Sequence, residues 1–245
     1  MLRRHKKRFP GAGGSAEREF NRRTHENIRA NWQPWLVGVA LIVGSAVYSF
    51  FVGGVAARLL AGVSGMCVGI LLVMYSLGGH ISAYWWRLGA EGERETAKQI
   101  EKLGPDWHCE HDLEHQYGNY DHVLVGPPGV FLLDSKFLHG VSAAAKDALR
   151  SGRVTYPGAS FRAGAKTVKV GLERRLGFRG PWVQSVVVVC GDFPQRHHEE
   201  EHVVYLVGED LVDWLTSMPE RANAPQRAAY ATALRELREE LGSTP

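Results

Sequence analysis

The residues best suited to chemistry are two aspartates and a lysine in neighbouring apolar segments. Asp134-Ser135-Lys136 lies in the apolar run that starts at Gly129, and Asp121 opens a second such run. Burying unpaired charge is costly, so charged residues inside an apolar run need a reason. Two carboxylates and a lysine at the ends of adjacent strands fit a metal-dependent phosphodiesterase site, because a divalent ion activates water and stabilises charge on a phosphate. The alternative is a salt bridge between Asp134 and Lys136 at a strand end.

Strand geometry predicts how these side chains lie. Side chains alternate between the two faces of a strand, so Asp134 and Lys136 share one face and Ser135 lies on the other. The turn Gly126-Pro-Pro-Gly129 predicts an antiparallel hairpin in which Asp121 and Asp134 are near neighbours. Two close carboxylates raise each other's pKa unless a cation lies between them. A hard ion with oxygen ligands, Mg²⁺ or Mn²⁺, is the cofactor that this pair predicts.

A further carboxylate from the preceding helix completes the predicted ligand set. Glu93 is the candidate, with Glu91 as the alternative. Both glutamates also suit a helix N-terminus, where negative charge interacts favourably with the helix dipole. Lys136 is predicted to orient the attacking water or to stabilise charge in the transition state.

The elements that must position these residues can be read from apolar patterns and turn signals. Helices are expected at 17–31, 89–103, 161–176, 209–217 and 225–241, strands at 107–115, 120–125, 130–137, 182–190 and 203–207, a turn at 116–119 and a hairpin turn at 151–152. This order predicts an α/β fold in which helices flank a mixed central sheet.

Two long segments before this domain have a different character. Residues 35–57 and 59–79 contain no charged side chain. A helix of about 20 apolar residues crosses a hydrocarbon core of ~30 Å. We therefore expect a transmembrane helical hairpin at 32–86, with spans at about 35–56 and 59–79. The alternative is a buried helical hairpin in a soluble protein.

The flanking charges predict an orientation. The basic tail, residues 1–31, holds nine Lys and Arg residues against three Glu, whereas the loop between the runs has only Arg58. By the positive-inside rule, both termini face the cytoplasm, from an inner or plasma membrane. The tail is expected to bind anionic lipid, or alternatively nucleic acid. The third segment, 87–245, is then a cytosolic domain.

Other residues are weaker candidates. Basic residues in the helix expected at 161–176 either contact nucleic-acid phosphates or form a solvated face: Lys166, Lys169, Arg174 and Arg175. His198 and His202 are four residues apart, as in some zinc sites, but no helical pattern surrounds them and an exposed polar loop is favoured. The three cysteines fit no metal spacing, and His108, His111 and His115 are interpreted as strand residues rather than ligands.

Four sequence elements in order carry a resemblance to a known family. They are Gly89-Ala-Glu-Gly-Glu93, Tyr120-Asp121-His122-Val-Leu-Val125, Gly129-Val-Phe-Leu-Leu-Asp134-Ser-Lys136 and Gly140. Over about residues 89–205 the chain resembles the nuclease-related domain, NERD, of the PD-(D/E)XK nuclease superfamily. The resemblance implies a restriction-endonuclease-like fold and a catalytic set of Glu93, Asp121, Asp134 and Lys136. It also implies DNA as substrate and Mg²⁺ as cofactor. The glutamine that this family often carries in the following helix is missing from 161–176.

Two functions of different classes follow. The first is a membrane-anchored, cytosol-facing, metal-dependent nuclease that hydrolyses DNA phosphodiester bonds. The second is a catalytically inactive nuclease fold that binds DNA or a protein partner at the membrane. The sequence after the basic tail is mildly acidic, which favours the second, because an acidic domain is a poor general binder of DNA. A homo-oligomer is a further expectation.

Overall fold

The structure is a computed structural model that describes residues 14–51, 54–115 and 118–242. The chain divides into two compact units. Residues 16–87 form one, called here the hairpin unit, and residues 88–242 form the described main part of the other, called here the sheet unit. Most of the basic tail's positive charge and half of the turn predicted at 116–119 lie outside the described residues.

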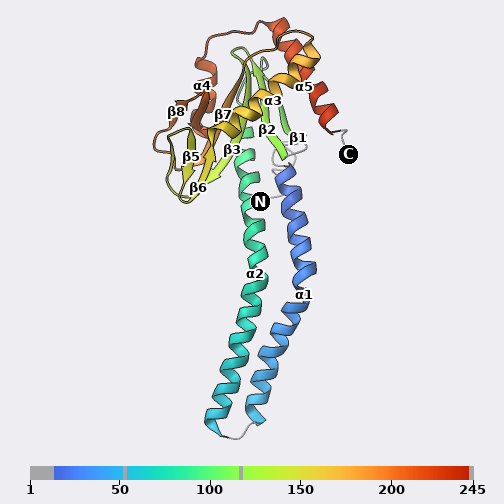
Figure 1. The fold of residues 1–245 in the computed structure, drawn as a ribbon, viewed down its shortest axis with the longest axis vertical. Coiled ribbons are helices and arrows are strands. Elements are labelled where there is room, and N and C mark those ends of the chain that lie inside the picture. Colours follow the sequence, from blue (N-terminus) through green and yellow to red (C-terminus); the bar gives the residue numbers. More distant parts are fainter. Residues whose placement is uncertain (1–13, 52–53, 116–117, 243–245) are drawn as a thin grey trace. The chain divides into compact units, whose positions relative to one another are not determined.

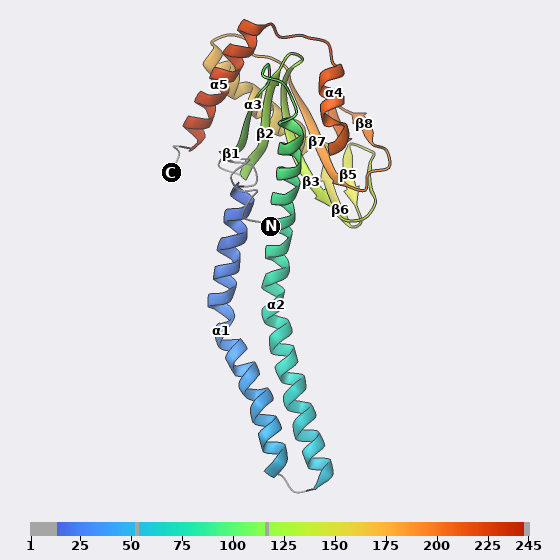
Figure 2. The ribbon, with the colours of Figure 1, turned by 180° about the vertical axis from the view of Figure 1, so that it is seen from behind.

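The hairpin unit consists of two long helices that lie side by side (Figures 1 and 2). Helix α1 spans Gly14–Phe51, and α2 spans Val55–Ile100, of which the part up to Arg87 belongs to this unit. Small residues permit close contact between them: a Cβ added at Gly65 would overlap Ser45, and one added at Gly69 would overlap Ile42. The predicted pair of helices with a short connection is confirmed.

The membrane-spanning part of that prediction is not supported. In the described parts of the chain, no helix combines the length and the apolar character that crossing a membrane requires. The prediction at 32–86 rested on the lack of charge over each run, and lack of charge is a weaker condition than hydropathy sustained over the length of a span.

The helix predicted at 89–103 is real but is not a separate element. It is the end of α2, which runs for 46 residues without a break through Gly78, Gly79 and Gly89. A glycine inside a helix costs only about 1 kcal/mol relative to alanine, whereas a proline would have ended the helix. Similarly, the polar helix predicted at 17–31 is the first part of α1.

The sheet unit is built on a six-stranded mixed sheet of order β1-β2-β3-β7-β9-β8. The strands are β1 His108–His115, β2 Gly118–Gly126, β3 Gly129–Leu138, β7 Val183–Gly191, β8 His197–Glu200 and β9 Val203–Val207. β1, β2 and β3 are antiparallel in succession, β3, β7 and β9 run parallel, and β8 returns antiparallel to β9. The predicted mixed α/β fold is confirmed.

Two parts of the sheet unit differ from the prediction. Three short strands, β4 Ser142–Ala144, β5 Ala148–Ser151 and β6 Val154–Pro157, form a second antiparallel sheet, in which Gly152 follows β5 as predicted. The segment expected to be a polar loop at His197–Glu200 is strand β8. This segment pairs with the buried strand β9. The backbone hydrogen bonds of that pairing stabilise an extended conformation that the polar local sequence does not predict.

Helices cover both faces of the central sheet (Figures 1 and 2). They are α3 Gly158–Leu176, α4 Leu211–Ser217 after the short 3-10 helix η2 Gly208–Asp210, and α5 Ala224–Gly242. On one face, Val123, Val130 and Leu132 pack with α3 and α5. On the other, Leu124, Phe131 and Leu133 pack with α4 and with the end of α2. The alternation predicted for the β2–β3 hairpin is therefore present.

Candidate active site

Asp121 and Asp134 lie beside each other at the open end of the β2–β3 hairpin. The strands pair in register from Gly126 opposite Gly129 to His122 opposite Leu133, and Asp121 and Asp134 are next in line. Asp121 Oδ2 accepts a hydrogen bond of 2.7 Å from the backbone N–H of Ser135. This bond ties the Asp121 carboxylate to β3.

Lys136 lies on the same face as Asp134 and forms an ion pair with it. The Lys136 Nζ atom also lies 5.5 Å from the centre of the Tyr156 ring and 5.8 Å from that of Phe161. Burial alone would lower the pKa of Lys136, but the carboxylates of Asp134 and Asp121 outweigh it and raise that pKa. Lys136 is therefore held as a cation.

The electrostatics of Asp121 are those of a crowded carboxylate. Burial raises the pKa of Asp121 well above its ordinary value, and the nearby carboxylates of Asp134 and Glu93 raise it further. Lys136 and the N–H of Ser135 lower this pKa but do not cancel the effect. The charged form of Asp121 is therefore disfavoured unless a cation lies between the carboxylates.

These three residues line a pocket of about 290 Å³. Its other walls come from β2, β3, β6, α3 and β7: Asn119, Tyr120, Leu132, Leu133, Tyr156, Pro157, Ser160, Phe161, Gly164 and Ser185. Gly164 permits α3 to approach closely, because a Cβ there would lie 3.0 Å from Leu132 Cδ2. The charged groups thus line a pocket whose other walls are largely apolar.

Glu93 does not line the pocket. It lies on α2 and is only 5% exposed, whereas the pocket walls come from other elements. Its charge nevertheless raises the pKa of Asp121, so its carboxylate is close enough to act on the site. The alternative, Glu91, is exposed. Of the two predicted glutamates, Glu93 is the one that the structure brings near Asp121.

The donor set fits a hard divalent cation. Asp121 and Asp134 offer carboxylate oxygens on adjacent strands, and Oδ1 of Asp134 is buried. Carboxylate oxygens are the ligands that Mg²⁺ and Mn²⁺ prefer. Asp121 and Asp134 are the residues that would hold such an ion. Among the described residues, the Glu93 carboxylate does not form a group of close ligand atoms with them.

The basic residues predicted to contact nucleic acid are dispersed along α3. Lys166 and Lys169 line a second pocket of about 320 Å³, together with Trp182 and His202. Lys169 pairs with Glu173 at 2.6 Å. Arg175 donates to the backbone carbonyl of Gly171 and pairs with Glu240, and Arg174 is exposed near the helix end. The structure therefore groups Lys166 with Lys169 but gives Arg175 an internal partner.

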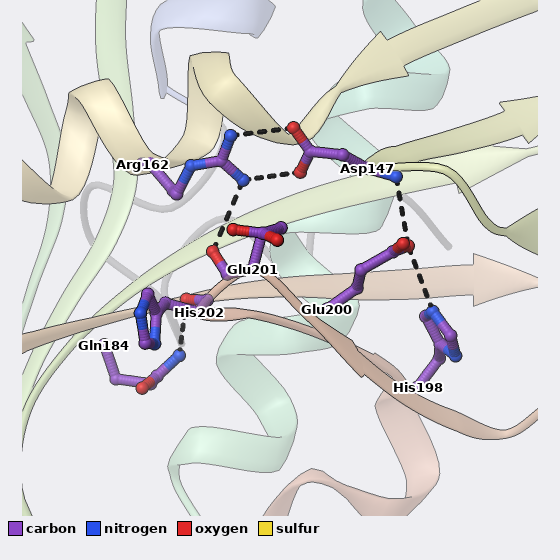
Figure 3. Close-up of polar contacts among 7 residues, drawn as sticks. All are labelled: Asp147, Arg162, Gln184, His198, Glu200, Glu201 and His202. Atoms are coloured by element: carbon purple, nitrogen blue, oxygen red, sulfur yellow. Dashed lines mark hydrogen bonds and ion pairs between the residues drawn. The ribbon is translucent and has the colours of Figure 1, made fainter.

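The histidines at 198 and 202 are not brought together. Figure 3 shows His198 and His202 on opposite sides of a polar network around Arg162. Arg162 binds Asp147 through both carboxylate oxygens and donates to the backbone carbonyl of Glu201. His198 lies 3.4 Å from a carboxylate oxygen of Glu200. The segment is a structural network and, within the residues shown, no metal site.

The sequence interpretation missed a partly buried polar cluster on the opposite face of the sheet. His111 and His122 are directly opposite each other on β1 and β2, and Cys109 lies two residues before His111. His122 is fully buried. The signal was available: a Cys-x-His pair on one strand and a histidine at the matching position of its hairpin partner.

Comparison with known proteins adds one match. No curated protein and no solved structure matches this chain. The family model of the nuclease-related domain, NERD, matches residues 88–190. This range contains Glu93, Asp121, Asp134 and Lys136, and it supports assigning this part of the chain to the nuclease-related family.

Proposed function

We propose that the sheet unit is a metal-dependent nuclease that hydrolyses phosphodiester bonds in DNA. The observation that carries this proposal is the pair Asp121 and Asp134, held in register beside Lys136 in the lining of a pocket. The family match supports a nuclease-related function. DNA as the substrate and the need for Mg²⁺ or Mn²⁺ are parts of the proposal.

The aspartates and the lysine have different roles in this proposal. Asp121 and Asp134 would hold Mg²⁺ or Mn²⁺, which supplies Lewis acidity towards the phosphate and towards water. The Lys136 ammonium lies where it can donate to a phosphate oxygen or orient the attacking water, and the Tyr156 and Phe161 rings hold its position. In the reaction, a water oxygen bonds to phosphorus as one P–O ester bond breaks. The products are a phosphate monoester and an alcohol.

Plasmid cleavage by the purified full chain tests this proposal. Wild-type protein with Mg²⁺ or Mn²⁺ is expected to nick or linearise the plasmid, and EDTA is expected to stop it. Asp134→Asn and Lys136→Met should each lower the rate at least about 100-fold, as loss of a group that stabilises the transition state does. The matched control is Asp213→Asn, the same chemical change at an exposed position of α4. Cleavage that survives both site variants would refute the mechanism.

An inactive DNA-binding or protein-binding module is the second candidate. Two observations favour it: Lys136 is paired with Asp134, and Glu93 comes from an element that does not line the pocket. Calorimetric titration separates the candidates. Heat of binding at millimolar Mg²⁺ or Mn²⁺, lost in Asp134→Asn, supports the enzyme, and absence of binding supports the inactive module.

Membrane attachment is a separate proposal and concerns the hairpin unit. Large apolar side chains are exposed along both helices, among them Leu36, Val43, Phe51, Leu60, Leu71 and Met74. An exposed apolar surface of this kind marks a contact with lipid or protein. We expect the full chain to sediment with membranes, with both termini on the cytoplasmic side and the basic tail on anionic lipid. Recovery in the soluble fraction would refute it, and light scattering of soluble protein would then reveal a homo-oligomer.

A further inference from the structure

A group of metal-binding side chains lies on the face of the central sheet opposite to the pocket. Cys109 and His111 of β1 and His122 of β2 each present one ligand atom, and the three atoms lie within 4.8 Å of one another. Cys109 Sγ is 3.9 Å from His111 Nδ1, and His111 Nδ1 is 2.7 Å from His122 Nδ1. The described parts of the chain contain no other such group.

Strand pairing rather than side-chain flexibility creates this group. His111 and His122 are partners in the β1–β2 register, so their side chains leave the sheet on the same face. Cys109 is two residues before His111 and shares that face because strand side chains alternate. Three ligands from two paired strands form a preorganised site, whose assembly costs little conformational entropy once the sheet has folded.

The surroundings of His122 resemble the outer shell of a metal site. Its Nε2 atom is directed to Ser135, whose Oγ lies 3.4 Å away, and its ring is hydrogen-bonded to the backbone of Glu93. Ser135 Oγ in turn donates to Thr96 Oγ1 at 2.8 Å. Metal-binding histidines generally use their second nitrogen in this way, which fixes the ring orientation. The Nδ1 atom of His122 therefore lies towards Nδ1 of His111.

The donor types differ from those of the pocket. One sulfur and two imidazole nitrogens suit Zn²⁺, whereas Mg²⁺ prefers oxygen. Around a tetrahedral Zn²⁺, the two nitrogens lie about 3.4 Å apart and a sulfur lies about 3.6 Å from each. The nitrogens would therefore separate, and Cys109 Sγ would move slightly closer to His111.

We propose that Cys109, His111 and His122 bind one transition-metal ion of the Zn²⁺ class, with water in the fourth position. On binding, the Cys109 thiol loses its proton to solvent and its sulfur forms the metal–thiolate bond. The metal would link the edge strand β1 to β2, next to Asp121. Its expected role is therefore to stabilise the position of β2 from the sheet face opposite to the pocket. The site is independent of the proposed function.

Cobalt provides the test, since Co²⁺ bound to thiolate absorbs light and Zn²⁺ does not. The purified full chain, stripped of metal, is titrated with Co²⁺. We expect a thiolate-to-cobalt charge-transfer band that saturates at one Co²⁺ per chain and disappears when Zn²⁺ is added. The midpoint of thermal unfolding should rise with the logarithm of the free Zn²⁺ concentration, as it does for any ligand that binds the folded state.

Substitutions of single residues identify the ligands and distinguish this site from the metal site proposed in the pocket. Cys109→Ser should abolish the charge-transfer band, and His111→Gln should weaken Co²⁺ binding at least 10-fold, as the loss of a ligand requires. Circular dichroism confirms that each variant is folded. Cys67→Ser changes an exposed thiol elsewhere and should leave the band intact, and so should Asp134→Asn. No band in the folded wild type, or a band that survives Cys109→Ser, would overturn the proposal, whatever the DNA-cleavage assay shows.

Discussion

Asp121→Asn is the substitution that most directly tests the electrostatics of the pocket. Burial and the nearby carboxylates of Asp134 and Glu93 raise the pKa of Asp121, so the charged form of Asp121 is disfavoured in the metal-free folded protein. Asparagine has nearly the same shape, carries no charge, and keeps an oxygen that can accept the hydrogen bond from the Ser135 N–H. We therefore expect Asp121→Asn to stabilise the metal-free protein at neutral pH while it abolishes DNA cleavage.

The direction in which the free energy of unfolding changes with pH follows from the raised pKa of Asp121. Between the unfolded-state pKa, about 3.9, and the higher folded-state pKa, the folded protein holds a proton that the unfolded chain has lost. The contribution of Asp121 to the free energy of unfolding therefore falls as pH rises through this window. One proton corresponds to a slope of ~1.4 kcal/mol per pH unit. Because Asp121 and Asp134 interact, the proton belongs to the pair.

Urea unfolding with EDTA, from about pH 4 to about pH 7, measures this slope for wild type and variant. The wild type should lose up to ~1.4 kcal/mol per pH unit relative to Asp121→Asn. Added Mg²⁺ should restore stability to the wild type and have little effect on the variant. Asp213→Asn should follow the wild type. The reasoning is refuted if Asp121→Asn is less stable than wild type at neutral pH, or if the two pH profiles are parallel.

Three further changes test the packing of the sheet unit by chemical unfolding. Gly126→Ala should lower the free energy of unfolding by about 1–3 kcal/mol, because the new Cβ would overlap the Trp107 ring. The control is Gly104→Ala, whose Cβ would have nothing within 4 Å. It should change the free energy of unfolding by less than about 0.5 kcal/mol. Leu172→Ala should cost about 2–5 kcal/mol, since this side chain is 0% exposed; a smaller loss would mean that the core relaxes around the cavity. Tyr205→Phe should be neutral or stabilising by about 1 kcal/mol, because within the described residues its buried hydroxyl has no hydrogen-bond partner, and a clear loss would indicate a partner such as bound water.

The β2–β3 hairpin could be predicted in detail because its signals are local. Gly126-Pro-Pro-Gly129 defines the turn, and apolar residues on both sides define the strands. Once the turn is placed, the register brings Asp121 next to Asp134 without further information. The same holds for Lys136, which alternation places on the face of Asp134.

Features that depend on distant segments could not be predicted in this way. Strand β8 has a polar sequence whose local character favours a loop, and its pairing with β9 overrides that preference. The short strands β4 and β6 have similarly weak signals. The length of α2 was missed because a span at about 59–79 and a helix at 89–103 were predicted as separate elements, although a long helix tolerates the glycines at 78, 79 and 89.

The Cys109 cluster shows a third kind of limit. Along the chain, Cys109, His111 and His122 show no metal-binding spacing. Only the β1–β2 register, with His111 opposite His122, joins them. Register propagated from one hairpin to its neighbour would have predicted the cluster, provided that the turn at 116–119 had been placed exactly.

The register of β2 therefore decides the chemistry of both faces of the sheet. Asp121 and His122 are consecutive, and alternation sends one to the pocket and the other to the cluster with Cys109 and His111. A slip of one residue would exchange them, placing an imidazole beside Asp134 and a carboxylate against the cluster. The Gly126–Gly129 turn holds the β2–β3 register, whereas the cluster depends on the β1–β2 register. Lengthening this turn by one residue should therefore abolish DNA cleavage and leave the thiolate–cobalt band intact. Loss of the band as well would show that the cluster also depends on the β2–β3 pairing.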